Sequence, residues 1–574
     1  MKRVQLSENA YNVAKSRYFL NGEDWEGCCR RVAYTIATPE KDKTYGEKFA
    51  EMISEMSFVP AGRILRNSGR PKGSILNCFH LSVGDSIEEI GECLKNSLIL
   101  WSEGGGVGLT FSNLRPKGDI ILGKGGQSSG LVSFMEVFNS AADKIESGGA
   151  RRAAALALVD ISHPEVLDFI DSKLTHGILK CFNISVGINN DFLEAVEGDK
   201  DWSFKFKQKH YGTLKARDIW NKMIKNMVAC GEPGIINWSN FAKNNSWYFA
   251  SVSGTNPCGE TCLSHAQSCD LGSLVLPAFI TGNVNTNWKK LESTIRLAVR
   301  FLDNVIDVNK YPLKEVDIQS HNARRIGIGV MGLAEYLFAK GVVYGSEKAV
   351  AETEKLMRFI RDCSYEASVE LAVEKGSFPK FDSLLYGKSS FIRKLPAPLR
   401  MDIKKHGVRN CTLMAMQPGG TISLVADVNG GIEPVFSKAF IRKDRVGERV
   451  YIHPKYQGML ENNQEIPDWF VDSFDIEPKD HFEMQVACQK YCDGSVSKTI
   501  NLPAHSTEED LSELLLEYAT DLKGVTVYRD GSRDGQILNR MSEVELKDHL
   551  SKNKKVEHSL EESQMSCATG ACDL

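Results

Sequence analysis

A cysteine and a glutamate two residues apart form the pair best suited to chemistry in this chain. Cys258 and Glu260 lie in Thr-Asn-Pro-Cys-Gly-Glu (255–260), where Pro257 and Gly259 favour a tight turn over a helix. A carboxylate beside a thiol disfavours the thiolate, so the pair is a poor anionic nucleophile. It suits hydrogen-atom chemistry better: the sulfur abstracts a hydrogen while the carboxylate takes a proton from a neighbouring hydroxyl. Taken singly, each residue has a plain structural alternative, a buried Cys in a turn and a solvated Glu.

A second cysteine motif, Ser-Cys-Asp-Leu-Gly-Ser, covers residues 268–273. Asn-Pro-Cys-Gly-Glu followed by Cys-x-Leu-Gly-Ser resembles the active-site finger loop of ribonucleotide reductase large subunits. Other segments resemble the same family in the same order, from Asn67 to Arg533. The resemblance implies an α/β fold: a ten-stranded α/β barrel of two antiparallel five-stranded halves with a central finger loop, preceded by a small helical N-terminal region.

The resemblance also implies a role for each reactive residue. Cys258 would carry a thiyl radical, and Glu260 would act as the general base. Asn256 would hydrogen-bond to the substrate and orient it. Cys78 and Cys269 would be the redox pair that supplies electrons to the sugar, although sequence alone makes Cys78 an ordinary strand cysteine.

Three regions are expected along the chain. Helical periodicity marks 1–75, a region too short for an added ATP-cone domain, so we expect no overall control by ATP and dATP. Residues 76–540 would form the catalytic barrel. In 541–574 Lys and Glu dominate and apolar residues are too sparse to pack, which predicts a flexible redox tail. Its Cys567 and Cys572 would shuttle electrons by thiol exchange; metal binding is the alternative, weakened because no other ligand pair is near.

The segment Met-Gln-Pro-Gly-Gly-Thr-Ile-Ser (416–423) predicts a strand–loop–helix junction. Free N–H groups and hydroxyls at a helix start can cradle phosphate without a basic side chain. The resemblance places the substrate phosphates at Gly420, Thr421, Ile422 and Ser423. A plain capped helix is the structural alternative.

Four residues resemble the specificity site of the family, where a deoxynucleotide or ATP effector sets the choice of substrate. Asp85 would touch the effector sugar and Arg115 its phosphates, while Arg151 and Arg152 lie in the loop that relays effector identity. A helix N-cap at Asp85 and a solvated turn at the two arginines are the structural alternatives. Dimeric relatives place this site at the subunit interface, so we expect a homodimer.

Composition limits the other functions. The 574 residues are 42% hydrophobic and 25% charged, which is typical of a globular protein, and a net charge of −4 argues against a nucleic-acid partner. Without a long apolar run or a signal peptide, we expect no membrane association and a cytoplasmic location. Fifteen scattered cysteines without zinc spacing predict reduced thiols and no metal site from side chains. Cys262, a third thiol near the finger loop, has no assigned role.

Residues late in the barrel bear on the cofactor. Class I large subunits receive the radical from a separate protein through two adjacent tyrosines, and here that place reads Val527-Tyr528. The surrounding segment resembles the class II enzymes, so we expect an adenosylcobalamin-dependent reductase that makes deoxyribonucleotides for DNA synthesis. Diphosphate substrates are favoured, and thioredoxin or glutaredoxin would reduce the tail. The alternatives are a class I large subunit with a separate radical-generating subunit, and a nucleotide sensor on a degenerate reductase fold, which the intact cysteines disfavour.

Overall fold

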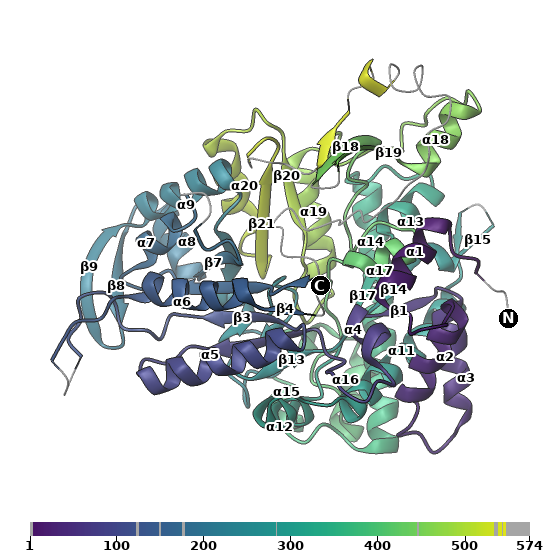
Figure 1. Cartoon of the computed structure of the whole chain (residues 1–574), viewed down its shortest axis with the longest axis horizontal. Coiled ribbons are helices and arrows are strands. Elements are labelled where there is room, and N and C mark those ends of the chain that lie inside the picture. Colours follow the sequence, from purple (N-terminus) through teal and green to yellow (C-terminus); the bar gives the residue numbers. More distant parts are fainter. Residues whose placement is uncertain are drawn as a thin grey trace.

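The computed structural model (Figure 1) describes residues 4–121, 125–147, 151–174, 178–282, 284–444, 447–532, 538–541 and 544–546. N-terminal helices lie at one end of the molecule, and two sheets form its middle with helices on their outer faces. In these parts of the chain, no helix combines the length and apolar character that a membrane crossing requires.

The small helical N-terminal region is confirmed. It consists of α1 (Glu8–Arg17), α2 (Trp25–Ile36), α3 (Thr44–Ser54) and α4 (Gly62–Asn67), with the short strand β1 (Phe58–Pro60) before α4. The Asp24 side chain caps α2 by accepting a hydrogen bond from the Gly27 backbone N–H. One face of α2 is buried, and α2 packs against α3 and against α11 (Trp288–Val308) further along the chain.

Eight strands form the larger sheet, in the order β13-β2-β3-β6-β7-β10-β21-β20. Their bounds are β2 (Cys78–Ser82), β3 (Gly106–Thr110), β6 (Ala155–Asp160), β7 (Phe182–Ile188), β10 (Gly234–Asn237), β13 (Gln267–Cys269), β20 (Thr499–Leu502) and β21 (Gly524–Arg529). The run from β2 to β10 is parallel throughout. It is bounded by antiparallel neighbours, β13 beside β2 and β21 beside β10. This run is one parallel half of the predicted fold.

The other half begins where the chain leaves β13. After Asp270 the chain enters β14 (Leu271–Val275), which pairs with β1 and, in parallel, with β17 (Gly327–Met331). Single parallel bridges then join Ile328 to Met414 and Met416 to Val496, just before β20, and β20 is parallel to β21. The two antiparallel halves are therefore confirmed, although single bridges rather than a continuous ladder connect β17 with β20 in the described residues.

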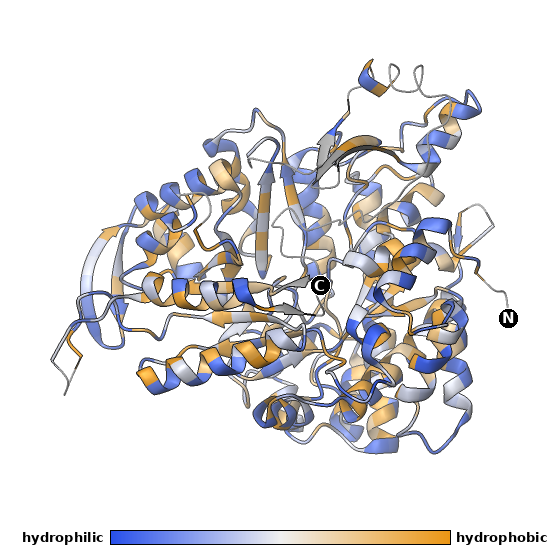
Figure 2. Ribbon diagram, in the orientation of Figure 1, coloured by the Kyte–Doolittle hydropathy of each residue, from blue (hydrophilic) through white to orange (hydrophobic). Residues whose placement is uncertain are grey.

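Helices surround the sheets, as Figure 1 shows. They include α5 (Ile87–Ser102), α6 (Leu131–Lys144), α9 (Ala216–Cys230), α11, α14 (Glu347–Lys375) and α19 (Pro478–Gln489). The long helix α14 ends at Lys375, directly before Gly376. Hydrophobic residues alternate with hydrophilic ones along the outer helices in Figure 2, because one face of each helix covers the core.

Candidate active site

The finger loop (residues 254–263) is a short hairpin whose tip carries Cys258, the candidate radical cysteine. Its two strands, β11 (Gly254–Thr255) and β12 (Cys262–Leu263), pair antiparallel. At the tip the Gly259 N–H donates to the Asn256 carbonyl oxygen at 3.1 Å, and Gly259 adopts φ +80°, a conformation that glycine tolerates. The turn predicted from Pro257 and Gly259 is confirmed, and it leaves Cys258 partly exposed at the tip.

Asn256 and Glu260 are buried on either side of that tip. Asn256 accepts hydrogen bonds through Oδ1 from the Thr261 N–H at 3.0 Å and from the Thr255 hydroxyl at 3.2 Å. Its amide Nδ2 is buried and has no hydrogen-bond partner among the described residues. The Glu260 carbonyl oxygen accepts from the Ser495 N–H at 2.7 Å, which fixes the loop to the second half. Asn256 therefore holds the turn with its oxygen and keeps two N–H donors for a ligand.

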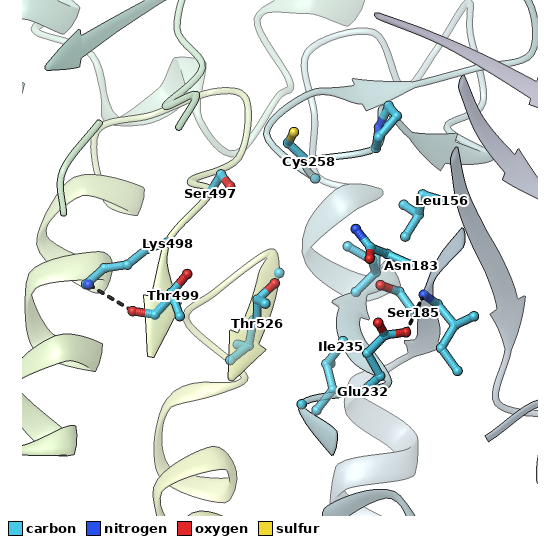
Figure 3. Close-up of a pocket in the computed structure, with 18 of the residues that line it drawn as sticks. Leu156, Asn183, Ser185, Glu232, Ile235, Cys258, Ser497, Lys498, Thr499 and Thr526 are labelled. Carbon is cyan, nitrogen blue, oxygen red and sulfur yellow. Dashed lines mark hydrogen bonds between the residues drawn. The ribbon is translucent and has the colours of Figure 1, made fainter. Parts of the chain in front are cut away.

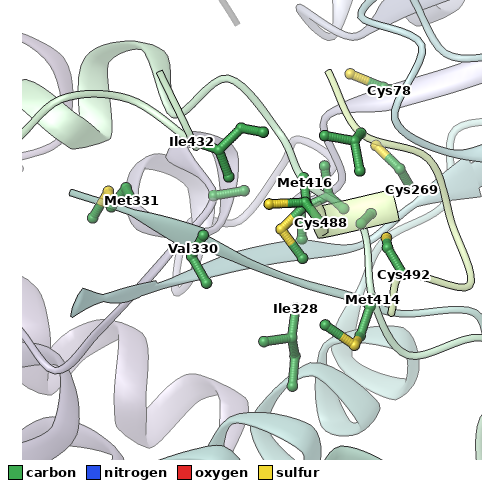
Figure 4. Close-up of a cluster of buried hydrophobic side chains, with 14 of the residues drawn as sticks. Cys78, Cys269, Ile328, Val330, Met331, Met414, Met416, Ile432, Cys488 and Cys492 are labelled. Atoms are coloured by element: carbon green, nitrogen blue, oxygen red, sulfur yellow. The ribbon is translucent and has the colours of Figure 1, made fainter. Parts of the chain in front are cut away.

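Cys78 and Cys269 face each other across two strands. They are direct partners in the antiparallel register of β2 and β13, and each is 1% exposed. Both thiols are free, and Figure 4 shows the two sulfurs in a cluster of buried hydrophobic side chains. Burial raises the pKa of the Cys269 thiol well above its ordinary value, and the neighbouring Cys78 and Glu260 raise it further. At neutral pH Cys269 is therefore a thiol that holds its hydrogen.

One pocket brings part of the predicted catalytic set together, while Cys269 and Asn256 do not line it. The Glu260 pocket has about 430 Å³ of empty space, part of it open to solvent. Its lining comes from the N-terminal region, β2, the finger loop, β14 and the 417–422 segment: Ala61, Gly62, Asn77, Cys78, Cys258, Glu260, Leu271, Gln417, Pro418, Gly419, Gly420 and Ile422. The pocket thus unites the candidate radical thiol, the base, one member of the redox pair and the candidate phosphate segment.

The candidate phosphate segment begins a short helix, α17 (Gly420–Val425). Gly420 and Ile422 line the Glu260 pocket, and the buried Ser423 hydroxyl donates back to the Gly420 carbonyl oxygen at 2.8 Å. Thr421, between them, is half-buried. The predicted loop–helix junction is confirmed, although Met416 before it forms a single bridge with Val496 instead of a strand, and the first turn of α17 faces the Glu260 pocket.

A second pocket lies on the other side of Cys258. The Glu232 pocket, with about 650 Å³ of empty space including its open part, is lined by the finger-loop tip and by residues of β6, β7, β10 and β21 and of the segment that enters β20. Figure 3 shows Cys258 at one end, with Asn183, Ser185 and Thr526 further in. Glu232 accepts from the Lys173 ammonium at 2.9 Å and from the Ile184 N–H at 3.1 Å. Cys258 therefore stands in the wall shared by two pockets of different composition.

Asp85 and Arg115, predicted for the effector site, are joined in the structure. The Asp85 carboxylate accepts from the Arg115 backbone N–H at 2.8 Å, from Nε at 3.0 Å and from Nη2 at 3.2 Å. Partial burial acts to raise the Asp85 pKa, but hydrogen bonds from Arg115 and Lys207 outweigh it and lower that pKa. The helix N-cap is Ser86, which forms a capping box with Glu89, so the structural alternative for Asp85 is not the one adopted.

Some predicted residues are placed only in part. Arg151 and Arg152 form β5 (Arg151–Arg152), which pairs with β4 (Glu146–Ser147), and only their backbone is described. Cys567 and Cys572 lie outside the described residues. Cys262, on β12, is buried in a cluster with Leu158, Ile236 and Phe241 and lines neither pocket.

Comparison with known proteins agrees with this arrangement. Residues 76–528 match the family described as "Ribonucleotide reductase, barrel domain", and residues 4–73 match "Ribonucleotide reductase, all-alpha domain". The chain belongs to the ribonucleotide reductase large-chain family.

Relatives at moderate identity share most of this chain. A "Vitamin B12-dependent ribonucleoside-diphosphate reductase" of Thermoplasma acidophilum is 37% identical over 86% of this chain and 66% of its own length. A protein of the same name from Mycobacterium tuberculosis is 34% identical over 93% of this chain and 81% of its own. A "Ribonucleoside-diphosphate reductase subunit alpha" of Chlamydia muridarum is 27% identical over 82% and 53%. The chain thus spans about two thirds of the first relative and four fifths of the second.

Sequence reasoning missed the Glu232 pocket entirely. Its polar residues come singly from strands far apart in the chain, such as Asn183 on β7 and Thr526 on β21. The one local signal is Cys-Gly-Glu-Pro-Gly (230–234), a glycine- and proline-rich break that leads into β10 at Gly234 and includes the buried Glu232.

Proposed function

We propose that the chain is a cobalamin-dependent reductase that converts ribonucleoside diphosphates to 2′-deoxyribonucleoside diphosphates. One observation carries the proposal: the tip thiol Cys258 separates a pocket that contains Glu260 and Cys78 from a pocket that contains neither. Such a wall suits a residue that receives a radical from one side and acts on a substrate on the other. The names of the relatives at 34–37% identity support both the diphosphate substrate and the cofactor.

Together with Cys269, the residues of the Glu260 pocket suffice for the chemistry on the sugar. A Cys258 thiyl radical takes the 3′ hydrogen, and Glu260 removes the proton of the 3′ hydroxyl, which eases loss of the 2′ hydroxyl as water. Cys78 and Cys269 supply two electrons and two protons and become a disulfide, and Cys258 returns a hydrogen atom to the 3′ carbon. The sum is one ribonucleotide and two thiols giving one deoxyribonucleotide, one disulfide and one water.

Substrate binding would use groups that the structure leaves available. The Asn256 amide, buried and without a partner among the described residues, would donate to a sugar hydroxyl. The first turn of α17, at Gly420–Ser423, would hold the phosphates through backbone N–H groups.

The Glu232 pocket fits the adenosyl end of the cofactor. Its amide, hydroxyl and carboxylate groups come from Asn183, Ser185, Thr526 and Glu232, between apolar strand residues such as Ile235, which suits a nucleoside with a polar sugar and a flat base. Bound there, adenosylcobalamin would supply a carbon-centred radical by cleavage of its cobalt–carbon bond. Cys258 would offer its S–H hydrogen to that radical, and the loop tip would keep the two pockets apart.

Assembly and regulation follow from the surface near Asp85. Exposed apolar side chains occur on α5, on α6 and on the segment between them, with Ile87 59%, Ile120 68% and Val137 48% exposed. Exposed apolar side chains on elements that flank a charged site suit a subunit interface. We assign a homodimer to this chain, with a deoxynucleotide or ATP effector at Asp85, Arg115, Arg151 and Arg152. Sedimentation of the Val137→Asp variant should show dissociation of the dimer into monomers.

Turnover would depend on the remaining regions. We assign 1–75 as the helical region, 76–540 as the catalytic barrel and 541–574 as the redox tail. Cys567 and Cys572 would reduce the Cys78–Cys269 disulfide by exchange and be reduced in turn by thioredoxin or glutaredoxin. A reaction that needs reduced thiols at every cycle suits the cytoplasm.

The test is CDP reduction by the purified chain with dithiothreitol, with and without adenosylcobalamin. We expect turnover only with the cofactor, its loss in Cys258→Ser, and its retention in Cys262→Ser, a neighbouring thiol that lines neither pocket. Turnover of CTP in place of CDP would overturn the diphosphate assignment. Activity that needs a second protein and no cobalamin would establish the class I alternative instead.

A further inference from the structure

A hairpin outside the two main sheets reaches the residues of the candidate effector site. It consists of β8 (Asp201–Phe206) and β9 (Lys209–Lys215), at the left of Figure 1, joined by Lys207 and Gln208. The Lys205 N–H donates to the Ser162 carbonyl oxygen at 2.7 Å, and Phe206 packs edge-on against His163. The hairpin tip is therefore fastened to the body of the protein.

Two lysines at this tip contact the acidic groups around Arg115. The Lys207 ammonium lies 2.9 Å from Asp85 Oδ2, and the Lys209 ammonium lies 2.7 Å from Asp119 Oδ1. The Tyr211 hydroxyl donates to the same Asp119 carboxylate. The lysine side chains are 68% and 64% exposed, so each ammonium can exchange its carboxylate for another anion.

The turn that connects β8 with β9 has an unusual sequence for its backbone conformation. Two-residue hairpin turns that need positive φ favour Asn and Gly, because other residues adopt that conformation at a cost. Here Lys207 has φ +53°. Its ammonium also lies 5.1 Å from the centre of the Phe206 ring, and that of Lys209 lies 4.4 Å from the centre of the Tyr211 ring. A lysine kept at a strained position indicates a use for its charge.

Asp85 has no acceptor position left for a ligand in this arrangement. An ionised carboxylate offers about four lone-pair sites. Oδ1 accepts from the Arg115 backbone N–H and Nε, while Oδ2 accepts from Arg115 Nη2 and from Lys207. A sugar hydroxyl that binds Asp85 must displace one donor. Lys207 makes a single, mostly exposed contact, whereas Arg115 makes three, so Lys207 is the donor that leaves.

We propose that Lys207 and Lys209 bind the triphosphate of the effector nucleotide, and that Lys207 moves from Asp85 to the phosphates as the effector sugar takes its place. This rests on the proposed function, which puts the effector at Asp85 and Arg115. A triphosphate carries several negative charges, and the Arg115 guanidinium alone supplies one positive charge. Lys207 and Lys209 at the hairpin tip add two ammonium groups, which contact the Asp85 and Asp119 carboxylates.

Equilibrium dialysis of dTTP and of thymidine tests the proposal on the full-length chain. Lys207→Met and Lys209→Met keep the apolar stem and remove the charge. We expect each to weaken dTTP binding about tenfold or more, as for loss of a charge-assisted contact. Thymidine, which has no phosphate, should bind Lys207→Met as tightly as the unmodified chain or more tightly, because Asp85 gains a free lone pair. The matched control is Lys215→Met, which removes an ion-paired lysine from the other end of the hairpin, beside Asp201.

The outcomes separate the two levels of the proposal. If Lys207→Met binds dTTP as tightly as the unmodified chain, Lys207 only occupies Asp85 and the proposal is wrong. Equal weakening of dTTP and thymidine would show a loss of hairpin structure rather than of phosphate contacts, and would also overturn it. Absence of dTTP binding to the unmodified chain would remove the effector site itself. Cobalamin-dependent CDP reduction without effector reports on the reductase function independently of all three results.

Discussion

Gly108 on β3 lies directly against the carbonyl oxygen of Thr255 at the base of the finger loop. A β-carbon at Gly108 would come within 1.8 Å of that oxygen, far inside contact distance. The finger loop can therefore pack this closely against β3 only because Gly108 has no side chain. Gly108→Ala should displace the loop and lower CDP reduction by at least about a hundredfold, because small displacements of reacting groups are costly.

Gly91→Ala is the control for that substitution. Gly91 lies on α5, where a β-carbon would meet no atom within 4 Å apart from its chain neighbours and the backbone of its own helix, and alanine favours a helix by up to about 1 kcal/mol over glycine. Its activity should be unchanged and its melting temperature equal or higher. Full activity in Gly108→Ala would show that the loop position is not what limits the chemistry.

The Cys78–Cys269 pair should oxidise without any change in the fold. Residues directly opposite on antiparallel strands have Cα atoms about 4.5–5.5 Å apart, which lies within the range that a disulfide spans. In a single turnover without dithiothreitol, we expect one disulfide per chain, between these two residues. Peptide mapping after alkylation in denaturant should find Cys262 fully alkylated. A disulfide that includes Cys262 would contradict the assigned pair.

Glu260→Gln should slow the reaction on the sugar while preserving the loop. The Glu260 backbone oxygen, not its carboxylate, bonds to Ser495, and glutamine keeps the side-chain shape. Loss of a general base typically costs 10²–10⁴ in rate, so kcat for CDP should fall by about that factor. Radical formation in the cofactor-loaded enzyme, followed by electron paramagnetic resonance, should persist. Loss of that signal together with turnover would place Glu260 in radical formation instead.

The local parts of the site were predictable from the sequence, and its long-range parts were not. Pro257 and Gly259 determine the turn at Cys258 through backbone preferences that act over four residues. Cys78 and Cys269 are far apart in the sequence, and their pairing could be predicted only because the family resemblance implies it. The Glu232 pocket, by contrast, is made by strands from both halves, and no local pattern reports which side chains meet there.

The effector region shows a further limit of the same kind. Asp85 and Arg115 were assigned separate contacts with an effector, yet in this structure each satisfies the other. Lys207 belongs to no sequence motif, because lysines are common in surface hairpins. Only its position beside Asp85 in the structure indicates a role for it.

Asp270, next to Cys269, should make stability depend on pH in an unusual direction. It is 3% exposed, and neither carboxyl oxygen has a hydrogen-bond partner among the described residues. Burial raises its pKa well above the ordinary 3.8, the charge of Asp303 adds to this, and Arg324 opposes it. Because the pKa of Asp270 is higher in the folded state, protonation of this carboxyl stabilises the folded protein. The contribution is fully present at pH values below the pKa of Asp270 in the unfolded chain. That contribution is lost as the pH rises through the folded pKa.

Asp270→Asn, neutral at every pH, should therefore gain stability relative to the unmodified chain as the pH rises from 5 to 9. We expect the advantage of the variant in melting temperature to be smaller at pH 5 than at pH 9, because the unmodified chain alone loses the contribution of the Asp270 proton as the pH rises. Asp510→Asn is the control of opposite sign, because hydrogen bonds from the Thr507 backbone and hydroxyl lower the Asp510 pKa. That carboxylate favours folding above its unfolded pKa, so its removal should give no gain at high pH. Differential scanning calorimetry across this range decides: a difference between Asp270→Asn and the unmodified chain that stays constant with pH would show that Asp270 is already ionised at pH 5 in the folded protein, so that burial does not raise its pKa.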